Sequence, residues 1–135
     1  MRAVGIILAG GNSNKMRELT HKRAVAAMPI AGSYRAIDFA LSNMSNSHIQ
    51  KVAVLTQYNA RSLNEHLNSS KWWDFGRKQG GLYVFTPTIT AENGYWYRGT
   101  ADAIYQNLDF LKRCHEPYVI ITSGDAVSVS YTHLR

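Results

Sequence analysis

Short apolar runs alternate with amphipathic segments along this chain. Four runs have the continuous hydrophobicity that is typical of buried parallel strands: residues 2–8, 52–56, 82–85 and 118–122. Apolar side chains at helical spacing predict helices over residues 35–44 and 63–67, and from residue 102 to about residue 113. This alternation predicts an α/β fold with a mostly parallel sheet, and ligands bind such sheets beyond the carboxyl ends of the strands.

The last predicted helix has one clearly apolar side. We expect this side to be lined by Ala103, Ile104, Asn107, Leu108 and Leu111. Lys112 and Arg113 follow at its carboxyl end, where positive charge is favourable. The segment is therefore expected to be one amphipathic helix that packs on the sheet.

Composition is that of an ordinary soluble domain, or part of one. Hydrophobic residues make up 45% of the 135 residues, which is enough for a real core. The apolar runs are too short to span a bilayer, and Gly10 and Gly11 interrupt any secretory signal. One cysteine, Cys114, excludes an internal disulfide and favours a reducing cytoplasm. The histidines lack metal-ligand spacing, so we expect them at the surface.

Positive charge is concentrated near the start of the chain. The formal net charge is +6, and residues 1–35 contribute +5 of it because they hold six basic side chains and only Glu18 as an acid. A local cluster of this kind fits a small anionic ligand better than nucleic acid, which calls for a longer basic stripe. Nucleic acid is therefore not the expected partner.

The first predicted strand ends in a pair of glycines, Gly10 and Gly11, and a basic loop follows. Glycines allow backbone N–H groups to approach a ligand, and Lys15, Lys22 and two arginines add charge just beyond. This combination predicts a phosphate site, most simply for a nucleotide. The alternative is a strand end that needs glycines to turn and carries surface lysines. The spacing matches neither the dinucleotide fingerprint nor the Walker loop.

Other candidate residues follow the later strands. Asp125 comes directly after a strand and a glycine, where a carboxylate can hold Mg²⁺ on triphosphate oxygens, although it could equally be a turn residue. Gln57 offers an amide to a nucleobase, but a solvent-facing glutamine is the commoner case. Gly99 and the residues after it allow a base or sugar edge to pack on backbone, and Asp102 would cap the helix or orient the ligand.

Taken together, the motifs are more specific than any one of them. They resemble the bacterial glucose-1-phosphate adenylyltransferases in Leu8–Gly11, Arg17–Thr20, Lys22–Ala24, Tyr34–Phe39, Leu41–Asn43, Leu55–Tyr58, Trp96–Ala103 and Ser123–Asp125, over about residues 3–126. The resemblance implies a Rossmann-like, three-layer nucleotidyltransferase sheet, of which this chain is the amino-terminal portion. It also implies that ATP and glucose 1-phosphate are joined into ADP-glucose, with release of pyrophosphate, for glycogen synthesis.

The resemblance also implies roles for individual residues. Lys15 and Asp125 would be catalytic, Asp125 would bind Mg²⁺, and Lys22 would be linked to an effector. Tyr97 would touch glucose 1-phosphate, whereas Gln57 and Trp96 match positions tied to nucleotide binding and the activator signal. The implied nucleotide- and substrate-binding positions are Leu8, Ala9, Gly10, Gly11, Gln57, Gly81, Trp96, Tyr97, Gly99, Thr100, Ala101 and Asp102.

The sequence departs from the catalytic members of that family near its basic loop. Those members carry glycine where Ser13 stands, arginine where Lys15 stands, and lysine then proline at Val25 and Ala26. Lysine keeps the charge of arginine but not its bidentate fork, and Val25 keeps no charge. These losses resemble the regulatory-type subunit of two-subunit enzymes, which would pair with a catalytic paralogue. A related transferase with another base or sugar is a third alternative.

The last residues form a second departure. After Asp125 the sequence of residues 127–135 differs from the family, and we expect this tail to be non-native. The remainder of the catalytic domain and the carboxyl-terminal β-helix of the family are absent from the sequence. The resemblance implies a homo- or hetero-tetramer for the full-length protein. We expect residues 1–135 alone to show no turnover, because the sugar-side residues that the family supplies later in the domain are missing.

Overall fold

The computed structural model describes residues 2–11, 24–57, 61–69, 81–87 and 96–127. Four strands form the main sheet: β1 (Ala3–Leu8), β4 (Lys51–Leu55), β5 (Gly81–Phe85) and β6 (Tyr118–Ser123). Four α-helices accompany them: α1 (Ala36–Asn46), α2 (Arg61–Ser69), α3 (Thr100–Gln106) and α4 (Leu108–Arg113). A 3-10 turn, η2 (Val25–Ala27), and a small antiparallel pair, β2 (Pro29–Ile30) and β3 (Tyr34–Arg35), connect β1 to α1.

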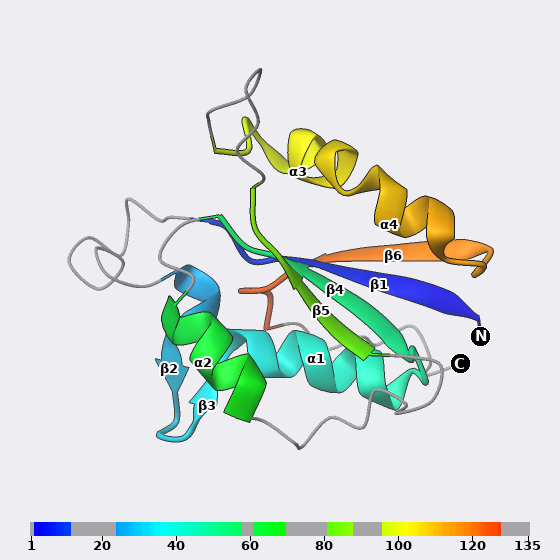
Figure 1. Cartoon of the computed structure of the whole chain (residues 1–135). Coiled ribbons are helices and arrows are strands. Elements are labelled where there is room, and N and C mark those ends of the chain that lie inside the picture. Colours follow the sequence, from blue (N-terminus) through cyan, green and yellow to red (C-terminus); the bar gives the residue numbers. More distant parts are fainter. Residues whose placement is uncertain (1, 12–23, 58–60, 70–80, 88–95, 128–135) are drawn as a thin grey trace.

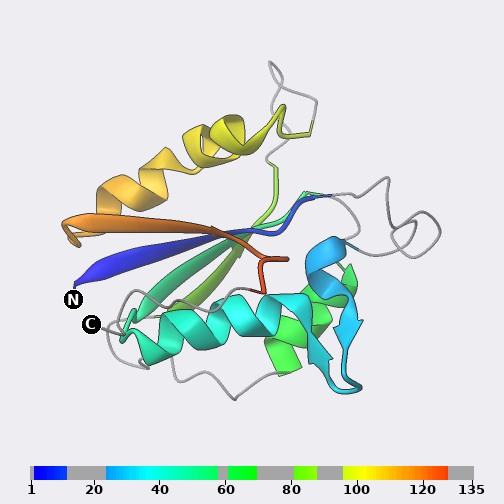
Figure 2. The ribbon, with the colours of Figure 1, turned by 180° about the vertical axis from the view of Figure 1, so that it is seen from behind.

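The main sheet has the order β5-β4-β1-β6, and every neighbouring pair is parallel. The helices lie in two layers: α1 and α2 cover one face, whereas α3 and α4 lie across the other (Figure 1, and from behind in Figure 2). The predicted α/β class, with a parallel sheet and three layers, is thereby confirmed. Because all strands run the same way, their carboxyl ends meet at one edge.

The central strands have the uniform burial that their continuous apolar runs predict. The residues of β1 are buried from Ala3 to Ile7, and β4 is buried from Val52 to Leu55. Gly5 in β1 allows α1 to approach closely, because a Cβ at this position would lie 2.9 Å from the sulfur of Met44. At the edge, β6 leaves Val119 and Ile121 about half exposed.

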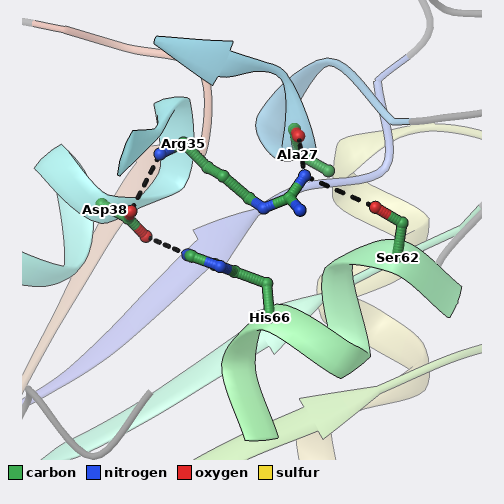
Figure 3. Close-up of polar contacts among 5 residues, drawn as sticks. All are labelled: Ala27, Arg35, Asp38, Ser62 and His66. Carbon is green, nitrogen blue, oxygen red and sulfur yellow. Dashed lines mark hydrogen bonds and ion pairs between the residues drawn. The ribbon is translucent and has the colours of Figure 1, made fainter. Parts of the chain in front are cut away.

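A polar cluster fastens α1 and α2 to η2 (Figure 3). The guanidinium Nη1 of Arg35 donates to the carbonyl of Ala27 at 2.6 Å and lies 3.5 Å from the hydroxyl of Ser62. Asp38 accepts the backbone N–H of Arg35 at 2.8 Å, and its other oxygen lies 2.7 Å from Nε2 of His66. The expectation that the histidines lie at the surface is wrong for His66, because this close contact with a buried carboxylate draws its ring inward.

The predicted continuous helix is also wrong in one respect, because the chain breaks it into α3 and α4 at Asn107. The backbone N–H of Asn107 bonds to the carbonyl of Ile104 at 3.1 Å, three residues back rather than four. Within the described residues, no helix has both the length and the apolar character needed to cross a membrane.

Candidate functional site

A cavity of about 320 Å³ opens at the carboxyl ends of the strands, between β1, β4, β6 and the start of α3. Its walls are made of Leu8, Ala9, Gly10, Gly11, Val25, Ala26, Leu55, Gln57, Tyr97, Gly99, Thr100, Ala103, Ser123 and Asp125. Segments far apart in the sequence therefore meet here, at the edge where the parallel topology predicts a ligand site.

The two glycines after β1 play different parts in this cavity. A Cβ on Gly10 would lie 2.8 Å from Cβ of Gln57 and 3.2 Å from its backbone nitrogen, so Gly10 is needed for the chain to pass beside the end of β4. A Cβ on Gly11 would meet no described atom within 4 Å. The open side of Gly11 is therefore the place where backbone could approach a ligand, whereas Gly10 is explained by packing.

Gln57 points across the cavity to the segment that precedes α3. Its side-chain Nε2 donates to the carbonyl of Tyr97 at 2.9 Å, which joins the end of β4 to this segment. The Tyr97 side chain is buried, with 5% exposed, and burial raises the pKa of its hydroxyl above 10.0. Tyr97 is therefore a neutral phenol at physiological pH, and the Gln57 amide is not simply a solvent-facing group.

The start of α3 forms a further wall of the cavity. Gly99 and Thr100 line it, and a Cβ on Gly99 would meet no described atom within 4 Å. Asp102 accepts hydrogen bonds from the backbone N–H of Arg98 at 2.9 Å and from Gln106 Nε2 at 3.0 Å. These contacts tie Asp102 to the segment before α3 and to the next turn of the helix, and neither Asp102 nor Ala101 lines the cavity.

Asp125 supplies a carboxylate at the mouth of the cavity. It follows Gly124, whose N–H bonds to the carbonyl of Leu8 at 2.9 Å and so holds the two strand ends together. The Asp125 side chain is exposed, and the hydroxyl of Ser123 donates to it. Among the described residues, Asp125 is the only carboxylate that lines the cavity, and no group of three or more potential metal ligands occurs.

This donor set fits a magnesium ion that arrives with a polyphosphate. Mg²⁺ prefers oxygen ligands, and it is commonly held by one or two carboxylates while substrate phosphates and water complete its shell. A single exposed carboxylate in the same cavity as Gly11 matches that pattern. It would not match a resident metal held entirely by protein side chains.

Some predicted residues lie elsewhere. The register pairs Gly81 with Lys51 at the opposite end of the sheet, so the parallel strand direction keeps it away from the cavity. Trp96 is 56% exposed and does not line the cavity. Lys15 and Lys22 lie outside the described residues. The cavity also uses Leu55, Ala103 and Ser123, which the sequence reasoning missed although their places at element ends could have pointed to them.

Comparison with known proteins gives the family. The profile described as "Nucleotidyl transferase" matches residues 4–134, so this chain belongs to the nucleotidyl transferase family. Among curated relatives, the glucose-1-phosphate adenylyltransferase of Clostridium kluyveri is 49% identical over 124 residues, which are 92% of this chain. The proteins of that name from Thermosipho africanus and Clostridium beijerinckii are each 46% identical over 132 residues, or 97% of this chain. The matches cover 32%, 32% and 34% of these relatives, so the chain spans about a third of their length.

Proposed function

We propose that this chain is the nucleotide-binding part of a glucose-1-phosphate adenylyltransferase, which forms ADP-glucose and pyrophosphate from ATP and glucose 1-phosphate. The observation that carries the proposal is the cavity at the carboxyl ends of β1, β4 and β6, with Gly11 open to it and Asp125 at its mouth. The identity of 46–49% to proteins of that name supports this substrate pair.

The reaction needs alignment and charge neutralisation more than covalent chemistry by the protein. An oxygen of the sugar phosphate attacks the α-phosphorus of ATP, the bond from that phosphorus to the bridging oxygen breaks, and pyrophosphate leaves. Gly11 would offer backbone to the phosphates, and Asp125 would hold Mg²⁺, which when bound neutralises phosphate charge. Lys15 would add a cation, and Lys22 would respond to an effector.

A second candidate is a non-catalytic regulatory subunit of the same enzyme, paired with a catalytic paralogue in a tetramer. The specific observation in its favour is Val25, an apolar side chain in the cavity wall where the catalytic members that this chain resembles carry lysine. A cation aimed at a transition-state charge is worth roughly two to three decades in rate. A chain without it would still bind nucleotide while contributing little turnover.

Nucleotide binding is tested by titrating the 135-residue chain with ATP, with and without Mg²⁺, in a calorimeter. We expect Asp125→Asn to weaken Mg²⁺-dependent ATP binding roughly 10- to 150-fold, because a charged contact worth about 1.5–3 kcal/mol is lost. Asp109→Asn is the matched control, since Asp109 is exposed on α4 and does not line the cavity. Equal effects of the two substitutions, or no binding of ATP by the unmodified chain, would contradict the proposed site.

A chimera separates the two candidates. Residues 3–126 replace the matching segment of the Clostridium kluyveri relative, and ADP-glucose formation is measured. A regulatory chain predicts low activity that rises roughly 10²–10³-fold when Val25→Lys is combined with Lys15→Arg. A catalytic chain predicts clear activity without these changes. No ADP-glucose from either version would argue against both candidates.

A further inference from the structure

Asn107 is a polar residue on the apolar side of the helical segment whose first turn lines the cavity. Its neighbours on that side, Ile104 and Leu111, pack against the small apolar cluster around Ile6 and Leu55. Asn107 lies at the junction of α3 and α4, and its amide makes two hydrogen bonds there. Nδ2 lies 2.8 Å from the carbonyl oxygen of Ala103 and 3.0 Å from the hydroxyl of Tyr97.

The Ala103 carbonyl fixes the orientation of this amide. The end of the amide that contacts a carbonyl oxygen must be the NH₂ group, because a carbonyl can only accept a hydrogen bond. The break between α3 and α4 frees that carbonyl, since the N–H of Asn107 bonds to Ile104 instead. The same NH₂ group contacts the Tyr97 hydroxyl, so Asn107 donates and the hydroxyl accepts.

The hydroxyl hydrogen of Tyr97 must then point away from Asn107. In the part of the chain that the structure describes, Tyr97 has no other hydrogen-bond partner for its hydroxyl. Tyr97 is buried but lines the cavity, and a buried phenol ordinarily finds an acceptor. The cavity is the space in which an acceptor from a ligand can be met.

We propose that Asn107 is a positioning residue that turns the Tyr97 hydroxyl into a hydrogen-bond donor for an acceptor oxygen of the ligand in this cavity. Under the proposed function, on which this inference rests, the acceptor is a phosphate or sugar oxygen of ATP or glucose 1-phosphate. The break between α3 and α4 is what brings the amide to this place. Asn107 acts through Tyr97 and need not touch the ligand itself.

The direction of the hydrogen bond can be tested without any ligand. Donation to the tyrosine oxygen stabilises the phenolate, so Asn107→Leu, which removes the donor but keeps an apolar side chain of similar size, is expected to raise the pKa of Tyr97. The measurement is a pH titration of the protein carrying ¹³Cζ-labelled tyrosine, with Tyr97→Phe to assign the signal. A lower or unchanged pKa in Asn107→Leu would overturn the proposed direction.

A double-substitution cycle tests the effect on ligands, with ATP–Mg²⁺ and glucose 1-phosphate as separate probes in the Clostridium kluyveri chimera. For the ligand that Tyr97 contacts, we expect Tyr97→Phe to weaken binding roughly tenfold and Asn107→Leu roughly three- to tenfold. Combining them should have no more effect than Tyr97→Phe alone. Tyr105→Phe, on an exposed tyrosine of α3, is the control and should leave binding unchanged.

The readouts separate this inference from a purely structural role and from the proposed function. Leucine suits the apolar side of the helix, so thermal stability of Asn107→Leu should be kept while affinity falls. Independent effects of the two substitutions, or parallel losses of stability and affinity, would overturn the positioning role. If the unmodified chimera binds neither probe, the proposed function fails, and the ligand-free titration still decides the direction of the hydrogen bond.

Discussion

The two faces of the sheet are built very differently. On the face covered by α1 and α2, one cluster of described residues contains fourteen buried hydrophobic side chains, several of them with no exposed surface. On the face covered by α3 and α4, the corresponding cluster of described residues contains four: Ile6, Leu55, Tyr97 and Ala103. The cavity lies on this thinly packed side, where hydrogen bonds from Gln57 and Asn107 orient the polar groups.

This difference indicates that one face of the sheet mainly stabilises the fold, whereas the other mainly positions the groups around the cavity. Stability comes mainly from the thick cluster, because free energy from burial scales with the apolar area removed from water. The thin face holds its residues through directional bonds, which fix the orientation of a few polar groups around an open space. We therefore expect the effects of substitutions on the two faces to differ both in kind and in magnitude.

The largest effect should come from the thick face. Leu41→Ala removes a side chain with no exposed surface, and we expect a loss of about 2–5 kcal/mol in the free energy of unfolding. Leu111→Ala, at a half-buried position on the thin face, should cost only ~1 kcal/mol. Urea denaturation of both variants measures the two losses in unfolding free energy. Equal losses would contradict the conclusion that the face covered by α1 and α2 contributes more to stability.

An intermediate effect is expected at the rim of the cavity. Gly10→Ala places a Cβ against Gln57 and should cost about 1–3 kcal/mol, because backbone rather than a flexible side chain must give way. The Cβ of Gly11→Ala would meet no atom of the described residues within 4 Å, and this substitution should change stability by no more than about 0.5 kcal/mol. Thermal denaturation gives both values. If Gly11→Ala lost as much stability as Gly10→Ala, the conclusion that only Gly10 is required for packing would be wrong.

The smallest effect should come from an ion pair at the opposite end of the sheet. Lys51 Nζ and Glu116 Oε1 are 3.0 Å apart, and this hydrogen bond holds the pKa of Glu116 below its ordinary 4.5. Because the folded-state pKa is lowered, the contribution is present above pH 4.5 and disappears as the pH falls through the folded-state value. Glu116→Gln should therefore cost about 0.2–1 kcal/mol at neutral pH.

The pH dependence supplies the check on this last prediction. Unfolding free energies of the unmodified chain and Glu116→Gln are compared from about pH 3 to pH 7, and the two curves should converge at the acid end. Curves that stay parallel over the whole range would show that Glu116 stabilises the fold by some means other than its charge.

More of the fold than of the candidate site can be predicted from the sequence. Continuous apolar runs predict the four parallel strands because buried strands have no alternating polar face to confuse the pattern. The helix break at Asn107 could not be predicted from the sequence. A single asparagine on the apolar side of a helix is compatible both with a continuous helix and with a broken one. The contact of His66 with Asp38 could not be predicted either, because it joins two helices that meet only in the folded chain.

Candidate site residues that follow a strand lie at the cavity, whereas the one that begins a strand does not. Gly10, Gln57 and Asp125 lie around the cavity because each follows a strand, and parallel strands end at one edge. Gly81 precedes its strand and therefore lies at the far end. The reason why residue 10 is a glycine was also beyond the sequence, because its close contact with Gln57 depends on how β1 and β4 are paired.

Gly124 has a consequence for how this family can vary. A Cβ here would lie 3.1 Å from Cβ of Ala26, 3.3 Å from Cβ of Ala9 and 3.3 Å from Cγ2 of Ile7. Three segments distant in sequence thus share a space in which one more methyl group would push its neighbours aside by a few tenths of an ångström. We expect side-chain sizes at positions 9, 26 and 124 to covary among related proteins, so that this part of the structure evolves as one unit rather than residue by residue.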